Sequence, residues 1–200
     1  MNAEDSQYLG RQVLNQYINK ALTQAQILDM GQEVSREEIT AAFMSIHPHK
    51  APGPDGFNGH FFRSTWASIG EEIISGIKYF FETGRLLKEL NTTTISLVPK
   101  VTNPSILNDY RPISCCSTIY KCISKVIANR LKRVLPSLID KAQSAFIKGR
   151  HISDNILLTQ ELMRNYHRKD SPVRCAIKVD LKKAFDTVRW DFILDLLSAL

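Results

Sequence analysis

The chain has 200 residues, 44% of them hydrophobic and 23% charged, and a formal net charge of +6. These values are those of an ordinary soluble globular protein that is long enough to bury a real core. No long apolar run is present, and the first thirty residues are polar and mixed. This pattern argues against a membrane span and a signal peptide, so we expect an intracellular protein of the cytoplasm or nucleus.

The N-terminal half of the sequence predicts helices separated by one sharp break. Apolar residues at helical spacing predict a helix over residues 8–29, and a capping-box pattern at Ser35 opens a second helix through about residue 46. Residues 47–56 hold three prolines and two glycines, which excludes a helix or a central strand there. Two further helical patterns cover residues 59–68 and 71–82, the second ended by Gly84.

The C-terminal half mixes strands and helices. Residues 92–98 are rich in β-branched side chains and predict a strand, which a turn-rich linker separates from a clear amphipathic helix over residues 119–135. A further helix is expected over residues 151–168, then a short apolar strand over residues 175–179. Apolar residues repeat at helical spacing again from Trp190, and the chain stops inside that pattern.

The cysteines and histidines do not form a recognisable zinc motif. No pair of cysteines has the C-x₂-C spacing, and we expect free thiols in a reducing compartment. The cysteines are Cys115, Cys116, Cys122 and Cys175. His47 and His49 flank a proline in a loop and are expected to be turn residues rather than ligands.

Positive charge is concentrated in residues 121–150, which contain eight basic residues and one acidic residue. Such a segment suits a polyanionic partner, because neutralising phosphates releases counterions and gives affinity independent of sequence. A solvated helix face is the equally open alternative.

One carboxylate, Asp180, follows the apolar strand over residues 175–179 directly. Hard cations such as Mg²⁺ take oxygen ligands and are usually held by one or two carboxylates together with substrate phosphates. Asp180 is therefore a candidate metal ligand. The alternative is that it only opens a turn or caps a helix, as aspartates commonly do.

Five segments in a fixed order resemble one known family. They are residues 49–57 (HKAPGPDGF), 95–100 (ISLVPK), 109–114 (DYRPIS), 143–150 (QSAFIKGR) and 178–186 (KVDLKKAFD). The series is similar to the fingers and early palm of a LINE-type (non-LTR) retrotransposon reverse transcriptase, most of all to the plant lineages. The resemblance covers nearly everything from about Glu33 to Leu200.

The resemblance implies a role for individual residues in DNA synthesis. Asp180 would be one of three carboxylates that hold two Mg²⁺ ions, and the backbone carbonyl of Leu181 would face a metal. Phe185 would lie under the sugar of the incoming nucleotide and disfavour a 2′-OH, although without the family it would be assigned to the core. Arg111 would bind the triphosphate with its guanidinium fork, and Lys100 would be a second phosphate contact unless it is only an exposed lysine at a strand end.

The implied partners are an RNA template, a DNA primer and a dNTP, with no evident protein partner. The candidate nucleic-acid contacts are basic side chains of the helix and of the QSAFIKGR segment, namely Lys121, Lys125, Lys132, Lys148 and Arg150. The loop of residues 50–57 would lie along the template, or it is a rigid loop that ends a helix.

The same comparison predicts an incomplete catalytic site. The family needs two further aspartates in a Tyr/Phe-Ala-Asp-Asp turn, and the chain ends twenty residues after Asp180 without one. We therefore expect a fragment truncated after the first catalytic motif, a nucleotidyltransferase by resemblance but inactive as an isolated chain. The alternatives are a non-catalytic nucleic-acid-binding remnant, or an unstable gene-model fragment whose apolar palm face aggregates.

The expected fold is α+β. Residues 1–32 would form an N-terminal helical extension, residues 33–172 the mostly helical fingers with the N-terminal motif region, and residues 173–200 the truncated start of a ferredoxin-like palm. In this arrangement Asp180 would stand at an exposed strand end and face Arg111 across an open cleft.

Overall fold

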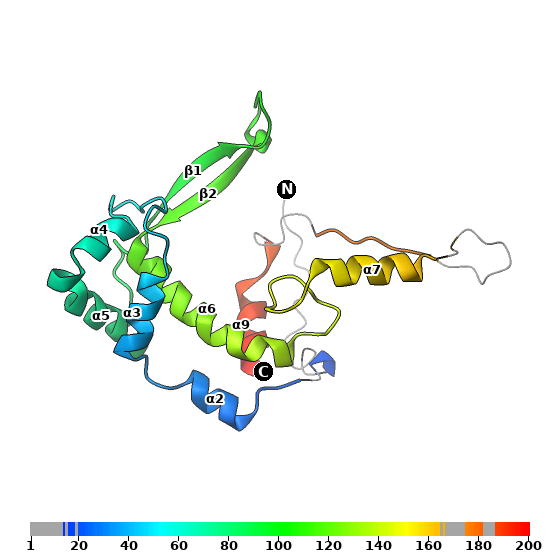
Figure 1. Ribbon diagram of the computed structural model, residues 1–200, viewed down its shortest axis with the longest axis horizontal. Helices are drawn as coiled ribbons and strands as arrows, with labels where there is room; N and C mark the ends of the chain where they lie inside the picture. The colour runs from blue at the N-terminus through cyan, green and yellow to red at the C-terminus, as the bar shows by residue number, and fades with distance from the viewer. Residues whose placement is uncertain (1–13, 15, 19, 165, 167–174, 182–186) are drawn as a thin grey trace. The chain divides into compact units, whose positions relative to one another are not determined.

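The computed structural model describes residues 14, 16–18, 20–164, 166, 175–181 and 187–200. The chain divides into two compact units. The central unit is Met30–Leu131, and the flanking unit combines Met1–Asp29 with Lys132–Leu200. Figure 1 shows the elements coloured in chain order.

The central unit is built from helices and one β-hairpin. Its elements are α3 (Arg36–Met44), α4 (Gly59–Ser64), α5 (Trp66–Thr83), β1 (Thr93–Pro99), the 3₁₀ turn η1 (Leu107–Asp109), β2 (Tyr110–Cys116) and the first part of α6 (Thr118–Leu138). The two strands form a single antiparallel sheet in which Thr93 pairs with Cys116 and Pro99 with Tyr110. This mixture of helices and a small sheet confirms the α+β expectation.

The hydrophobic core of the central unit lies between α3, α4, α5 and α6. Ile39, Phe43, Ile77 and Val126 have at most 1% of their surface exposed, so each helix contributes its apolar stripe. The Phe43 ring meets the ring of Phe62 edge to face at a centroid distance of 5.5 Å. The amphipathic helix expected over residues 119–135 thus contributes to this core as part of α6.

The helix boundaries in this unit follow from their caps and from one close contact. Ser35 Oγ accepts a hydrogen bond from the Glu38 backbone N–H at 3.1 Å and starts α3, while Gly84, with φ of 69°, ends α5. The expected break between two helices near Gly70 is wrong. The chain breaks at Thr65 instead, and Gly70 lies inside α5, where an added Cβ would come within 3.0 Å of the Trp66 ring.

The described residues of the flanking unit contain α2 (Gln24–Met30), the end of α6, α7 (Ile152–Leu162) and α9 (Trp190–Ala199). The continuous helix expected over residues 8–29 is wrong, because residues 21–23 are not helical. Thr23 and Gln26 form a reciprocal capping box that starts α2: Gln26 Oε1 accepts from the Thr23 N–H at 2.9 Å, and Thr23 Oγ1 accepts from the Gln26 N–H at 3.3 Å.

The strand expected over residues 175–179 is also wrong. Residues 175–181 are exposed and adopt no regular structure. A strand is stable only when its backbone N–H and C=O groups pair with a neighbouring strand, and the described part of the chain offers this segment no such neighbour. The helix expected from Trp190 onward is confirmed as α9.

The division expected at residues 32 and 172 stays a prediction. Among the helices that the structure describes, none combines the length and the apolar character needed to cross a membrane.

Candidate nucleotide and nucleic-acid interface

The β1–β2 hairpin brings two predicted phosphate ligands to one face. Arg111 pairs with Val98 across the sheet, and the Lys100 N–H donates to the Asp109 carbonyl at 2.7 Å, which continues the register by one residue. Because paired residues share a face and alternate residues return to it, Lys100, Val98 and Arg111 lie on the same side of the hairpin. Figure 1 shows the hairpin extending away from the helices of the central unit.

Both charged side chains of this face are exposed. The Lys100 ammonium donates to the Asn108 carbonyl at 2.7 Å, a contact within the turn that joins the strands. The Arg111 guanidinium has no side-chain hydrogen bond or ion pair with the residues that the structure describes. A guanidinium fork and an ammonium group on one face of a hairpin are suited to phosphate oxygens.

Asp109 shapes the turn that precedes Arg111. Its Oδ2 accepts hydrogen bonds from the backbone N–H groups of Ser105 at 2.9 Å and Ile106 at 3.1 Å. These two donors lower the pKa of the Asp109 carboxyl below its ordinary value. The carboxylate thus fixes the connection between β1 and β2.

The start of α6 is tied to the proline-rich loop of residues 47–58. Lys121 Nζ donates to the Ala51 carbonyl at 2.6 Å, and Thr118 Oγ1 donates to the Phe57 carbonyl at 3.0 Å. Gly53 approaches this helix so closely that an added Cβ would lie 2.4 Å from the Ser117 nitrogen. Lys121 therefore braces the loop, and its role as a nucleic-acid contact stays a prediction.

The arginines of the basic segment are used inside the protein. Arg130 pairs with Glu38, and Arg133 pairs with Asp29 at 3.3 Å. Arg150 donates to main-chain carbonyls at the end of α6 and in the loop that follows it, namely Pro136, Ile139, Asp140 and Gln143. The sequence did not predict these internal ion pairs and hydrogen bonds, because composition shows where a charge is but not which acceptor it contacts.

Four lysines of the same segment have no side-chain partner among the described residues: Lys125, Lys132, Lys141 and Lys148. Lys125 is half-buried on α6 in the central unit, and the other three are exposed and belong to the flanking unit. Lys132 and Lys148 line the same pocket of about 310 Å³, although sixteen positions separate them in the chain. This part of the predicted nucleic-acid surface is thus brought together by the fold.

Asp180 is exposed and lies in irregular chain, and Leu181 beside it is 73% exposed. Within the described residues, no group of three or more His, Cys, Asp or Glu side chains is arranged to hold a metal ion. Phe185 and Asp186 lie outside the described residues. Asp180 and Arg111 belong to different units, so their expected meeting across a cleft stays a prediction.

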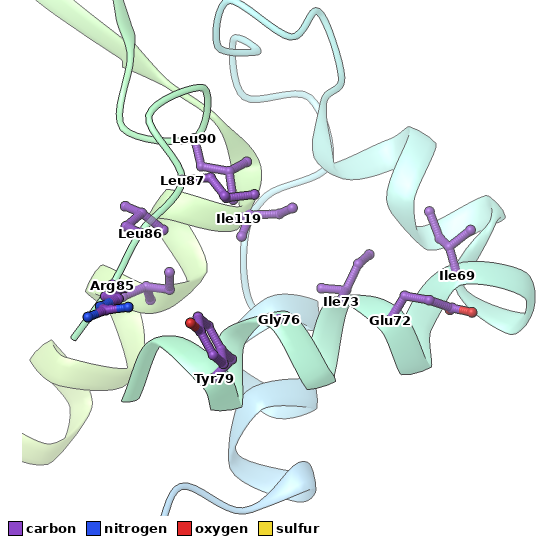
Figure 2. Close-up of a pocket in the computed structure, with 11 residues that line it drawn as sticks. Ile69, Glu72, Ile73, Gly76, Tyr79, Arg85, Leu86, Leu87, Leu90 and Ile119 are labelled. Carbon is purple, nitrogen blue, oxygen red and sulfur yellow. The ribbon is translucent and has the colours of Figure 1, made fainter. Parts of the chain in front are cut away.

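The central unit also holds an apolar pocket of about 520 Å³ that sequence reasoning missed. Figure 2 shows Ile69, Ile73 and Tyr79 on α5 facing the pocket, with Leu86, Leu87 and Leu90 from the segment after α5 and Ile119 from α6. The leucine-rich run after Gly84 was the available signal. Glu72 and Arg85 are the charged side chains of its lining, which offers little chemistry beyond apolar contact.

Comparison with known families identifies the chain's lineage. Residues 98–200, from the end of β1 to the last residue, match the family described as reverse transcriptase (RNA-dependent DNA polymerase). The matched range includes Lys100, Arg111 and Asp180.

Individual relatives extend the similarity toward the N-terminus. The 149 kDa protein of transposon TX1 from Xenopus laevis is 31% identical over 166 residues, which cover 83% of this chain and 13% of that protein. The Pol polyprotein of the type-1 retrotransposable element R2 from Nasonia vitripennis is 28% identical over 177 residues, 87% of this chain and 16% of that protein. The R2DM polyprotein from Drosophila melanogaster is 25% identical over 166 residues.

The chain thus spans a small share of the length of the relatives it matches. They are proteins of non-LTR elements, which agrees with the resemblance seen in the five ordered segments. The chain belongs to the reverse transcriptase family and is homologous to the proteins of the TX1 and R2 retrotransposons.

Proposed function

We propose that this chain supplies the nucleotide-binding and template-binding part of an RNA-directed DNA polymerase domain from a non-LTR retrotransposon. The observation that carries the proposal is the shared face of Lys100 and Arg111 on a hairpin that enters the matched family range. Neither residue is near the other in sequence, and the antiparallel register alone brings them together.

On this proposal, the hairpin face binds the triphosphate of a dNTP. Arg111 holds two phosphate oxygens in a fork, and Lys100 turns from the Asn108 carbonyl toward a third. Asp109 keeps the turn in place while Lys100 moves, because its contacts are to backbone N–H groups. Phe185 is proposed to favour deoxyribose by contact with the sugar.

Reverse transcriptases generally use a divalent metal, which stabilises charge on the attacking and leaving oxygens. In this chain Asp180 and the Leu181 carbonyl offer oxygen donors of the kind that Mg²⁺ prefers. The described residues hold no group of three or more His, Cys, Asp or Glu side chains arranged around a metal, so they do not form the three-carboxylate site for two ions. We therefore propose that Asp180 is one ligand of that site and that the 200-residue chain does not polymerise by itself.

The proposed contacts to the RNA template and DNA primer are the lysines that have no side-chain partner within the part of the chain that the structure describes. Lys125, Lys132 and Lys148 contact phosphates on this proposal. Lys121 and Arg150 act mainly through the backbone carbonyls they already hold, which shapes the surface instead of extending it.

The test is fluorescence anisotropy of a labelled RNA–DNA primer duplex with the 200-residue chain at increasing salt. We expect affinity to fall steeply with salt, and the double variant Lys132→Gln/Lys148→Gln to bind more weakly with a salt slope reduced by about 2. The matched control, Lys78→Gln/Lys88→Gln, removes the same charge from the central unit and leaves the slope unchanged. Binding that ignores salt removes the proposal.

A second candidate function is nucleic-acid binding without nucleotide recognition. The lysines that have no side-chain partner among the described residues, Lys125, Lys132 and Lys148, are the observation that favours it. The two functions differ in their response to a dNTP complementary to the template, added with Mg²⁺. A polymerase-derived site binds the duplex more tightly with the matched dNTP and loses this gain in Arg111→Ala, whereas a purely nucleic-acid-binding chain shows no gain.

A further inference from the structure

We infer that the Phe146 ring is a stacking platform for a base of single-stranded nucleic acid, with Lys132 and Lys148 beside it to hold the adjoining phosphates. This inference rests on the proposed function and adds to it a residue that reads bases by contact with their faces. Phe146 lies in the loop between α6 and α7, and Phe146, Lys132 and Lys148 all belong to the flanking unit.

Phe146 has an unusual backbone conformation. Its φ is 65°, and no other non-glycine residue in the part of the chain that the structure describes has a positive φ. Bulky side chains are strained in this region, which glycine occupies at no cost. A loop that needed only the turn would favour glycine here, as it has at Gly149 with φ of 82°. Strain retained by a bulky side chain points to a use for that side chain.

The loop around Phe146 is held firmly. Arg150 donates to the carbonyls of Gln143 at 2.6 Å and Ile139 at 3.2 Å. Asn155 Nδ2 donates to the Ala142 carbonyl and to Ser144 Oγ, both at 3.0 Å. Ile147, the next residue, is 9% exposed and anchors the loop. The backbone is therefore fixed on both sides of Phe146.

The Phe146 side chain does not serve this anchoring, because it is 89% exposed. A phenylalanine ring normally gains stability by leaving water, so a rigid loop that presents it to solvent forgoes that gain. A flat aromatic face can stack with an unpaired base. Because the loop that carries this face is already fixed, little conformational entropy of the protein is lost on binding.

The pocket around the ring is positively charged, which favours a negatively charged partner such as a nucleic acid. Phe146 lines a pocket of about 310 Å³ with Lys132, Leu135, Pro136, Ile147 and Lys148, and no acidic side chain is in this lining. Asp140, the acidic residue of the loop, accepts from the Ala142 N–H at 2.8 Å. An aromatic ring that shares a pocket lining with two lysines, neither of which has a side-chain partner among the described residues, suits a chain of alternating bases and phosphates.

The proposal is tested with two labelled 12-nucleotide RNA strands, one ordinary and one with abasic sites throughout, bound to the 200-residue chain. The wild type is expected to bind the ordinary strand about 10-fold or more tightly than the abasic strand. Phe146→Ala loses that preference and keeps its affinity for the abasic strand, while Phe146→Trp retains the preference. Lys132→Gln/Lys148→Gln weakens binding of both strands alike.

The control is Trp190→Ala, since Trp190 is also an exposed aromatic residue of the flanking unit, at 79%. It should leave the preference intact. The stacking proposal is overturned if the Phe146→Ala variant still prefers the ordinary strand, or if it loses the same amount of affinity for both strands. Either result leaves the proposed phosphate contacts standing. A wild-type chain that binds neither strand overturns the stacking proposal, and a simultaneous lack of binding to the RNA–DNA duplex removes the proposed function as well.

Discussion

Arg130 and Glu38 form a two-point ion pair, with Nε 2.9 Å from Oε1 and Nη2 2.7 Å from Oε2. The same guanidinium donates to the carbonyls of Met30 at 2.9 Å and Gln32 at 2.6 Å. The Arg130 side chain of α6 thus contacts both the first turn of α3 and the segment that precedes it. In that first turn, the Glu38 N–H also donates to the Ser35 cap. The two side chains are only 12% and 26% exposed.

Loss of this arginine is expected to destabilise the central unit. Arg130→Ala removes the ion pair to Glu38 and the donor to three carbonyls, those of Met30, Gln32 and Glu33. The free energy of unfolding should fall by about 2–4 kcal/mol. Arg130→Lys keeps the charge but loses the fork and should recover only part of this. The control, Arg133→Ala, breaks a half-exposed pair with Asp29 and should cost less than about 1 kcal/mol. Urea unfolding followed by circular dichroism measures all three, and equal losses for Arg130→Ala and Arg133→Ala would contradict this account.

Glycine replacements should have opposite effects at two positions. Gly53→Ala places a Cβ 2.4 Å from the Ser117 nitrogen and must push the proline-rich loop away from α6, at a cost of about 1–3 kcal/mol. Gly76→Ala fills open space inside α5 and should stabilise the protein by about 0.5–1 kcal/mol. Thermal unfolding of the two variants provides the comparison. A neutral Gly53→Ala would show that the loop does not pack on α6 as described.

The cysteines are expected to react at very different rates. Burial raises the pKa of the Cys122 thiol to about 12, and its side chain has no exposed surface. Only the thiolate is a nucleophile, so Cys122 should stay unmodified by iodoacetamide at pH 8 while exposed Cys175 is alkylated. Mass spectrometry of the digested native protein reads out each site. Rapid alkylation of Cys122 before unfolding would contradict its place in the core.

The turn before β2 should loosen in acid. The pKa of Asp109 is lowered in the folded chain, so its stabilising contribution is present above the ordinary Asp value of about 3.9 and is lost as the pH falls through the lower, folded value. NMR titration of the Ser105 and Ile106 amides should report this change. Asp109→Asn should abolish it. A titration midpoint above about 4 would contradict the two backbone hydrogen bonds.

The core helices could be predicted from the sequence because the buried face of a helix requires apolar residues at helical spacing. The amphipathic helix expected over residues 119–135 is confirmed as part of α6, where Val126 is fully buried. β2 was missed for a physical reason. It contains Pro112, and its pairing with β1 depends on residues up to 23 positions away. A two-stranded sheet consists only of edges, and edge strands tolerate proline.

The site was predicted unevenly for similar reasons. The family resemblance singled out Arg111 and Lys100, and the strand register places them on one face. The strand before Asp180 was not predicted correctly, because an apolar run becomes a strand only with a partner. Arg150 was assigned to nucleic acid, yet its donors meet carbonyls, including Gln143 and Ile139. Phe146 belongs to the QSAFIKGR segment but was not singled out within it, since its positive φ and its exposure are visible only in the structure.

The most direct test of the proposed function grafts residues 98–200 into the matching segment of an active non-LTR reverse transcriptase and measures primer extension on an RNA template with Mg²⁺. We expect the graft to extend the primer and Asp180→Asn to abolish extension, because the metal site loses a charged ligand. The matched control, Asp154→Asn, removes an exposed carboxylate at the start of α7 and should retain activity. A graft that binds the primed template without extending it would contradict the proposed function of the segment. Extension by the Asp180→Asn graft at the rate of the Asp154→Asn graft would contradict the proposed role of Asp180.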